Sequence, residues 1–243
     1  MHFHLPKPLH GWRAFAGEVG IIVVGVLIAL GAEQVVSGAH DRSTAAEARA
    51  NIMDEIRFNM GTIMLREKSE ACEQKRLREI DSYLDAVDRG QRPKPLQWVG
   101  APFAPLLFHT NFQAAQSAGK FFLLPTSEQR RLAQFYVDFD DFNEAATREW
   151  YDWAALRSLA GGHPAPGPAE IDRLRAAVQD ARAADWFVRI DSSHPMESAR
   201  QMGVAVSPRP GDPYQVASVC LAADTPYAEA VKLAGRKLAP FPE

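Results

Sequence analysis

The apolar residues divide the chain into an uncharged N-terminal run and a longer region with helical periodicity. Residues 19–32 carry no charged side chain, and Glu18 and Glu33 flank them. Extended to residues 14–36, the run has 23 positions, and about 20 helical residues cross the roughly 30 Å hydrocarbon layer of a bilayer. Carboxylates close to the headgroups keep contact with water and are tolerated there. The pattern therefore predicts a transmembrane helix over residues 14–36.

The charges before this span predict its orientation. Lys7 and Arg13 precede it, and no acidic residue comes before Glu18. Positive charge marks the cytoplasmic side of a span. We therefore expect residues 1–13 to form a cytoplasmic N-terminal segment. Residues 37–243 are expected to form a helical domain outside the bacterial inner membrane, in the periplasm of a Gram-negative cell.

Two other interpretations of the apolar run stay open. A cleaved signal peptide is the first, because Ser37 and Ala39 are small residues that suit a signal peptidase. Glu18 inside the apolar region and the long lead before it argue against cleavage. A buried helix of a soluble protein is the second interpretation.

One face of the predicted span is a candidate packing surface. It combines small residues with both flanking carboxylates, and small residues let helices approach closely within a membrane. Other glycines form a second small-residue face, so the glycines do not single out one interface. The candidate face consists of Glu18, Ile22, Gly25, Ala29 and Glu33.

From Ser43 to Arg89 the chain has the pattern of a long amphipathic helix. No proline occurs there, and apolar residues recur in steps of three, four and seven. Direct continuation from the span is expected. Charged side chains between Arg66 and Arg76 break the apolar pattern, and we interpret this stretch as a solvated face.

Further helices are predicted after a proline-rich break. Residues 90–105 hold four prolines and two glycines, which stop the first helix. Residues 111–118 predict a short helix that Gly119 ends. Thr126 as N-cap, with Gln129 three residues later, forms a capping-box pattern before a buried aromatic stripe. The stripe contains Leu132, Phe135, Tyr136, Phe139, Phe142, Trp150, Trp153 and Leu156.

The C-terminal third predicts one more long helix and a tail. Residues 169–203 have helical periodicity with Trp186 on the apolar side, and Pro195 is expected to interrupt the helix. Prolines are frequent from about residue 204, so only residues 227–238 allow another helix. The predicted fold class is all-α: a transmembrane helix that continues into a long amphipathic helix, a helical-bundle body, and an extended Pro-rich C-terminal tail.

The chain has two cysteines, Cys72 and Cys220. In an oxidising compartment two cysteines of one domain commonly pair, and such a bond would attach the tail to the first long helix. Free thiols and an intermolecular bridge remain alternatives.

Composition and motifs exclude several functional classes. The 243 residues carry 27 Lys and Arg against 30 Asp and Glu, so no positive surplus is available for general nucleic-acid binding. A mean hydropathy of −0.22 is too polar for a protein with several spans. HExxH, GxSxG, Walker-type and GxGxxG patterns are missing. The acidic run from Asp138 to Glu144 lacks the pattern of a calcium loop, and Glu144 is expected to pair with Arg148. We therefore expect no catalytic residue, cofactor or metal.

The opening of the chain carries a family resemblance. It reads HFHLPKPLHGWRAFAGEVGIIVVGVLIALGAEQ, which resembles the start of a family of uncharacterised proteobacterial proteins with a single N-terminal transmembrane helix and a helical extracytoplasmic domain. Weaker similarity covers the helix with Cys72, the WVG at Trp98, the segment after Thr126 and the CLAADTPY around Cys220. The resemblance implies a membrane-anchored envelope protein and pairing of the cysteines, and it implies no activity.

These observations predict an envelope protein that acts by binding or scaffolding rather than by catalysis. The lipid bilayer is its expected partner, with a homo-oligomer or another membrane protein as a candidate partner through the span. A ligand-sensing or accessory subunit of a membrane complex is one alternative. An envelope enzyme with an unrecognised site is another, which a pocket joining His109, His194 and acidic residues would favour.

Overall fold

The computed structural model describes residues 11–206 and 218–237, and within these ranges the chain is helical and has no strand. The all-α prediction is therefore confirmed. Residues 1–10 of the predicted cytoplasmic segment and 207–217 of the predicted tail lie outside the described residues. The α-helices are α1 (Gly11–Asp88), α2 (Thr110–Ser117), α3 (Thr126–Leu156), α4 (Pro168–Gln201) and α5 (Tyr227–Lys237), and the 3-10 helices are η1 (Lys120–Leu123), η2 (Arg157–Leu159) and η3 (Ser218–Cys220).

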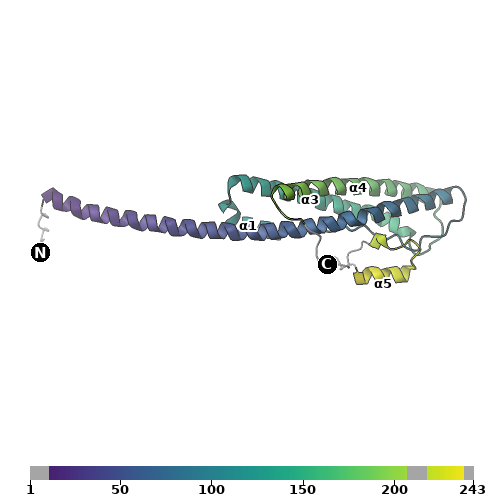
Figure 1. The fold of residues 1–243 in the computed structure, drawn as a ribbon. Coiled ribbons are helices and arrows are strands. Elements are labelled where there is room, and N and C mark those ends of the chain that lie inside the picture. Colours follow the sequence, from purple (N-terminus) through teal and green to yellow (C-terminus); the bar gives the residue numbers. More distant parts are fainter. Residues whose placement is uncertain (1–10, 207–217, 238–243) are drawn as a thin grey trace, which may run out of the picture.

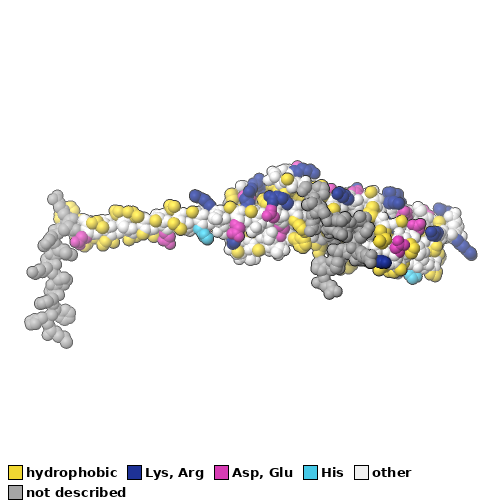
Figure 2. Space-filling view, turned by 60° about the horizontal axis from the view of Figure 1, so that its bottom comes forward, with side chains coloured by type: hydrophobic (Ala, Val, Ile, Leu, Met, Phe, Trp, Pro, Cys, Tyr) yellow, Lys and Arg dark blue, Asp and Glu magenta, His cyan; other side chains and the backbone are white. Residues whose placement is uncertain are grey.

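One uninterrupted helix, α1, forms both a bare N-terminal rod and one side of the body (Figure 1). Between Phe15 and Ser43 its side chains are exposed, whereas from Ala48 onward one face is buried. Hydrophobic side chains cover the bare part (Figure 2). Among the described residues, α1 alone is long and apolar enough to cross a membrane. The predicted continuation of the apolar run into the long amphipathic helix is confirmed.

The body is a bundle in which α4 packs closely against both α3 and the C-terminal part of α1, while α3 reaches α1 through side chains of the two shared apolar cores (Figure 1). α1 and α3 run away from the bare rod, and α4 returns toward it. Two apolar cores follow one another along the bundle. The proximal core, nearest the rod, joins Ile52 and Ile63 of α1 to Phe139 of the aromatic stripe. The distal core joins Leu84 of α1 to Trp153 of α3. Burial of the stripe agrees with the sequence prediction.

Residues 89–109, here called the connector, return along the bundle and contribute side chains to both cores. Backbone groups of an extended segment in a core need hydrogen-bond partners. The Asn59 side chain accepts from the Phe108 N–H (3.0 Å) and donates to the Phe108 carbonyl (2.8 Å). Asn143 makes the same pair of bonds with Leu107 (2.7 and 3.1 Å). Buried polar side chains therefore hold the connector in register with α1 and α3.

Residues 218–237, the C-terminal strap, are attached to the connector and to α1. The Ala101 N–H donates to the Ser218 hydroxyl (2.8 Å), and the Val219 N–H donates to the Ala101 carbonyl (3.2 Å). The Cα atoms of Cys72 and Cys220 lie 4.9 Å apart with their sulfurs at disulfide distance. The strap is therefore fixed at its start by hydrogen bonds and a covalent bond.

Gly100 marks the closest approach of strap and connector. Its φ is +76°, and a Cβ there would lie 2.6 Å from backbone atoms of Ser218 and Val219. Gly100→Ala is therefore expected to destabilise the protein by about 1–3 kcal/mol more than Gly90→Ala, since overpacking adds to the left-handed strain. Gly90 is the matched control, with φ +72° and open space around it. Thermal unfolding of both variants measures the difference, and equal losses would contradict the close approach.

Three details of the predicted helices are wrong. α3 begins at Thr126 itself, and Gln129 donates to the Leu124 carbonyl (2.7 Å) instead of closing a capping box. α4 continues through Pro195, whose buried ring packs at the level of the proximal core. Trp186 lies on the exposed side of α4, because Asp185 takes the buried position beside it. The predicted extended tail contains η3 as well as α5, which confirms the helix expected near residue 227.

Candidate functional site

Four buried ionisable side chains separate the two apolar cores. Arg66 and Glu73 come from α1, Glu149 from α3 and Asp185 from α4, and each is at most 6% exposed. Nη2 of Arg66 lies 2.6 Å from Glu73 Oε2, 2.7 Å from Glu149 Oε1 and 3.1 Å from Asp185 Oδ1. These four residues are called the charge cluster below. One guanidinium nitrogen thus connects all three helices of the bundle.

Hydrogen bonds in the charge cluster are incomplete. The Ser69 hydroxyl lies 2.7 Å from Glu73 Oε1 and 2.8 Å from the Arg66 carbonyl, and it donates to one of them at a time. Nε of Arg66 and Oε2 of Glu149 are buried without a hydrogen-bond partner. An unsatisfied buried polar atom costs about 1–3 kcal/mol.

The cluster holds one positive group against three carboxyl groups. Burial raises the pKa of the Glu73 carboxyl to about 7, although Arg66 and Ser69 oppose the shift. Burial also raises the pKa of the Glu149 carboxyl well above its ordinary range, again against the attraction of Arg66. Burial alone would lower the pKa of Arg66, but the three carboxylates outweigh it and raise that pKa. Bound protons therefore neutralise part of the negative excess near neutral pH.

The raised pKa of Glu73 predicts a pH dependence of stability. The folded carboxyl titrates at about 7, and a Glu in the unfolded chain titrates at about 4.3. Between these values the folded state binds more protons, so stability is greatest below about pH 4.3 for this group and falls as pH rises toward 7. The slope is at most about 1.4 kcal/mol per pH unit, and Glu149 acts in the same direction.

Urea denaturation between pH 5 and 8 tests this dependence. The wild type should lose stability across the window relative to Glu73→Gln, which carries no titrating group at this position. If the free energies of unfolding of the two proteins changed with pH in parallel, this would contradict a raised pKa at Glu73.

The three carboxyl groups also approach the geometry of a metal site. Glu73, Glu149 and Asp185 each offer an oxygen, and these oxygens lie within 4.8 Å of one another. Such ligands suit Mg²⁺ or Ca²⁺. Nη2 of Arg66, however, is within 3.1 Å of all three groups and already supplies a positive charge to them. A metal ion would have to displace this guanidinium, so we interpret the cluster as an ion-pair network.

Two surface pockets between α1 and α4 lead to the charge cluster. One, of about 390 Å³, has Arg66 in its lining, and the other, of about 400 Å³, has Asp185. Arg189 lines both pockets and is paired with Glu70 on α1 (Nη1 to Oε1, 2.9 Å). Its Nε also lies 4.0 Å from Asp185 Oδ2. The partly exposed Arg189 side chain therefore lies where water and protons would approach the cluster.

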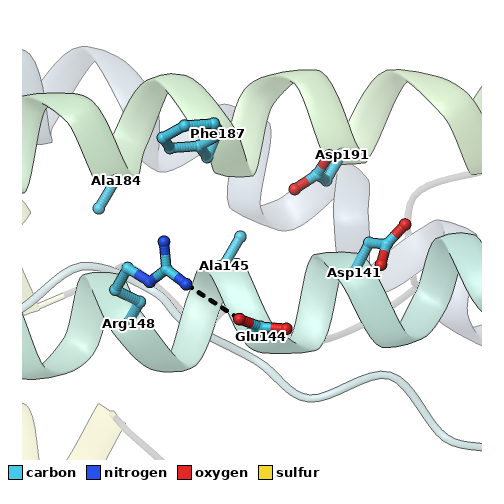
Figure 3. A pocket seen from close by; sticks show the side chains of 7 residues that line it. All are labelled: Asp141, Glu144, Ala145, Arg148, Ala184, Phe187 and Asp191. Carbon is cyan, nitrogen blue, oxygen red and sulfur yellow. Dashed lines mark hydrogen bonds and ion pairs between the residues drawn. The ribbon is translucent and has the colours of Figure 1, made fainter.

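A third pocket, of about 200 Å³, lies between α3 and α4 (Figure 3). Phe187 lies above it, Asp141 and Asp191 lie at one end, and Arg148 pairs with Glu144 (2.9 Å) as predicted. Burial and the neighbouring Asp141 raise the pKa of the Asp191 carboxyl. Neither His109 nor His194 lines this pocket.

The structure places the predicted site residues in two regions. Cys72 and Cys220 meet where the strap crosses α1. The candidate packing face lies on the bare rod, and all of its side chains are exposed: Glu18, Ile22, Gly25, Ala29 and Glu33.

The interpretation of the stretch from Arg66 to Arg76 as a solvated face holds for Glu67, Lys68 and Lys75, which are exposed, and is wrong for three other charged residues. Arg66, Glu73 and Arg76 are at most 3% exposed, and Arg76 donates to the carbonyls of Trp98 and Val99. A signal was available in the sequence. These residues continue, in steps of three, four and seven, the same helix face that holds Ile63 and Leu77.

Comparison with known proteins finds no matching family model, no similar curated protein and no similar solved structure. The charge cluster and the bare rod are therefore interpreted from their own geometry.

Proposed function

We propose that the chain is a single-pass protein of a bacterial inner membrane that holds a helical binding or scaffolding body in the periplasm. The observation that carries this proposal is the continuity of α1. The same helix is mostly apolar and exposed between residues 15 and 36 and forms one side of the packed body from Ala48 onward. An exposed apolar run of this length is unfavourable in water and is stabilised by a bilayer.

The cysteine pair supports the periplasmic side of this proposal. Structural disulfides persist in oxidising compartments and are rare in the cytoplasm. The bond between Cys72 and Cys220 lies within the body and not in the rod. The charge pattern before the span and the resemblance of the opening sequence to membrane-anchored proteobacterial proteins point in the same direction.

Thiol labelling in intact cells tests the topology. A membrane-impermeant thiol reagent should label Cys72 and Cys220 only after the outer membrane is permeabilised and the pair is reduced. The Cys72→Ser, Cys220→Ser variant is the blank. Labelling only after cell lysis, without any need for reductant, would place the body in the cytoplasm and contradict the proposal.

A sensing or accessory subunit is the second candidate function. The observation that favours it is the position of Arg66 and Glu73 on α1, the helix that also forms the rod. A change of protonation in the charge cluster would alter the packing of α3 and α4 on that helix. Cysteine cross-linking between copies of a Gly25→Cys variant tests this candidate. The yield of cross-linked dimer should change between pH 6 and 8, and adding Glu73→Gln should abolish the change.

A further inference from the structure

Two large apolar side chains are exposed at the end of the body nearest the rod. Phe122 is 66% and Leu123 is 41% exposed on η1, whereas Phe121 and Leu124 on either side of them are buried in the proximal core. Figure 1 shows the teal segment that contains α2 and η1 at this end. Of these four consecutive apolar residues, the outer two pack into the core and the inner two lie in solvent.

One ion pair and one packing contact show which residues of α1 lie beside η1. Nζ of Lys120 lies 3.7 Å from Glu47 Oε2, and Ala45 packs against the same proximal core as Phe121. At 1.5 Å per residue, the end of the predicted span at Val36 is about 14–17 Å from this level. The headgroup layer fills roughly 5–7 Å of that distance, because a bilayer of about 40–45 Å has a core of about 30 Å.

Helix tilt reduces the remaining gap. Transmembrane helices tilt by about 20° on average, and the body lies to one side of α1. With helix axes about 8–10 Å apart, a tilt of about 20° toward that side lowers η1 by about 3 Å. Contact with the headgroup layer therefore needs a tilt near the upper end of the roughly 0–40° range of transmembrane helices, and no rearrangement of the bundle.

The charges around the apolar pair favour anionic lipid. Lys120 lies beside Glu47 and Arg49 pairs with Glu128, so the positive surplus of this region comes from Arg130 and Arg131, which are exposed near the start of α3. Figure 2 shows Lys and Arg side chains, with some Asp and Glu, over the end of the body close to the rod. Aromatic and apolar residues flanked by basic residues are typical of segments that lie at a membrane interface.

We propose that η1 is a second membrane contact, in which Phe122 and Leu123 enter the headgroup layer while Lys120, Arg130 and Arg131 bind anionic headgroups. These five residues form the membrane-proximal patch. The inference rests on the proposed membrane anchoring and goes beyond it, because the body itself then touches the bilayer. The contact fixes the direction in which α1 tilts.

Spin labelling of the full-length protein in vesicles tests this contact. Nitroxides are attached to single added cysteines, Leu123→Cys, Leu106→Cys and Ile28→Cys, while the native pair stays oxidised. Leu106 is the matched control, because it is also an exposed leucine (54%) of the body. It lies on the connector close to the level of Asn59, which is farther from the predicted span than η1. Collision rates with oxygen, which concentrates in lipid, and with a polar nickel complex report the depth of each label.

In vesicles that contain phosphatidylglycerol, the oxygen-to-nickel ratio at position 123 should exceed that at position 106 severalfold. The ratio should fall in pure phosphatidylcholine vesicles, and Arg130→Gln with Arg131→Gln should abolish the difference between the lipids. An aqueous ratio at position 123 together with a lipid-like ratio at position 28 would overturn the second contact and leave the anchor intact.

Three other outcomes would also overturn the proposal. Equal ratios in the two lipids would exclude recognition of anionic headgroups. Protection of position 123 from both reagents would indicate a protein contact, such as a second copy of the chain. An aqueous ratio at position 28 would overturn the anchor and the second contact together.

Discussion

Replacing Arg66 with methionine is expected to lower the free energy of unfolding by about 3–5 kcal/mol. The variant leaves Glu73, Glu149 and Asp185 buried without the guanidinium that lies within 3.1 Å of all three. Uncompensated buried charge is among the largest single-residue penalties in proteins. Urea denaturation in detergent micelles, followed by Trp fluorescence, measures the loss.

Two further variants separate charge from side-chain volume. Arg148→Met removes the exposed partner of Glu144 and should cost no more than about 0.5 kcal/mol. The triple variant Arg66→Met, Glu73→Gln, Glu149→Gln should recover much of the loss, because two of the three negative groups are then removed. A triple variant as unstable as Arg66→Met alone would show that packing, and not charge, makes Arg66 important.

Removing the disulfide is expected to have an effect of similar size. The bond between Cys72 and Cys220 spans a sequence separation of 148. In the chain-entropy model, closing such a loop stabilises the folded state by about 5 kcal/mol. The double variant Cys72→Ser, Cys220→Ser should therefore lower the melting temperature strongly and increase hydrogen exchange first in the strap.

The wild type treated with reductant provides the control for this variant. It should reproduce both effects, since it breaks the same bond without changing a side chain. An unchanged melting temperature after reduction would contradict the expected stabilisation.

The sequence predicts helices well where burial is apolar. The spacing of Ile52, Ile56 and Ile63, and the aromatic stripe that begins at Leu132, mark the buried faces of α1 and α3 directly. The same reasoning fails at Trp186, because it assigns a large apolar side chain to the core. On α4 the buried position belongs to Asp185, whose partner Arg66 makes a charged residue acceptable there.

The charge cluster could not be predicted from any one segment of the sequence, because it depends on how three helices are aligned. Helical spacing could have placed Arg66 and Glu73 on the buried face of α1. Which carboxyl groups of α3 and α4 meet them depends on the axial register of three helices, and the connector contributes to that register by bonding to α1 and α3. Its anchors, Asn59 and Asn143, bond to backbone atoms about 36 to 49 positions away in the chain. No local pattern carries that information.

The unbroken course of α1 also fixes how the body is turned about the axis of the bare rod. No loop or proline lies between the predicted span and Ala48. The number of residues in 37–43 therefore sets both the rotation of the body about the helix axis and its distance from the predicted span. One residue added there would turn the body by about 100° and raise it by about 1.5 Å. Seven added residues would raise it by about 10 Å and turn it back to within about 20° of its original orientation. In the proposed membrane-anchored protein, the side of the body that faces a neighbour packed on the rod is therefore set by the number of residues in one short segment.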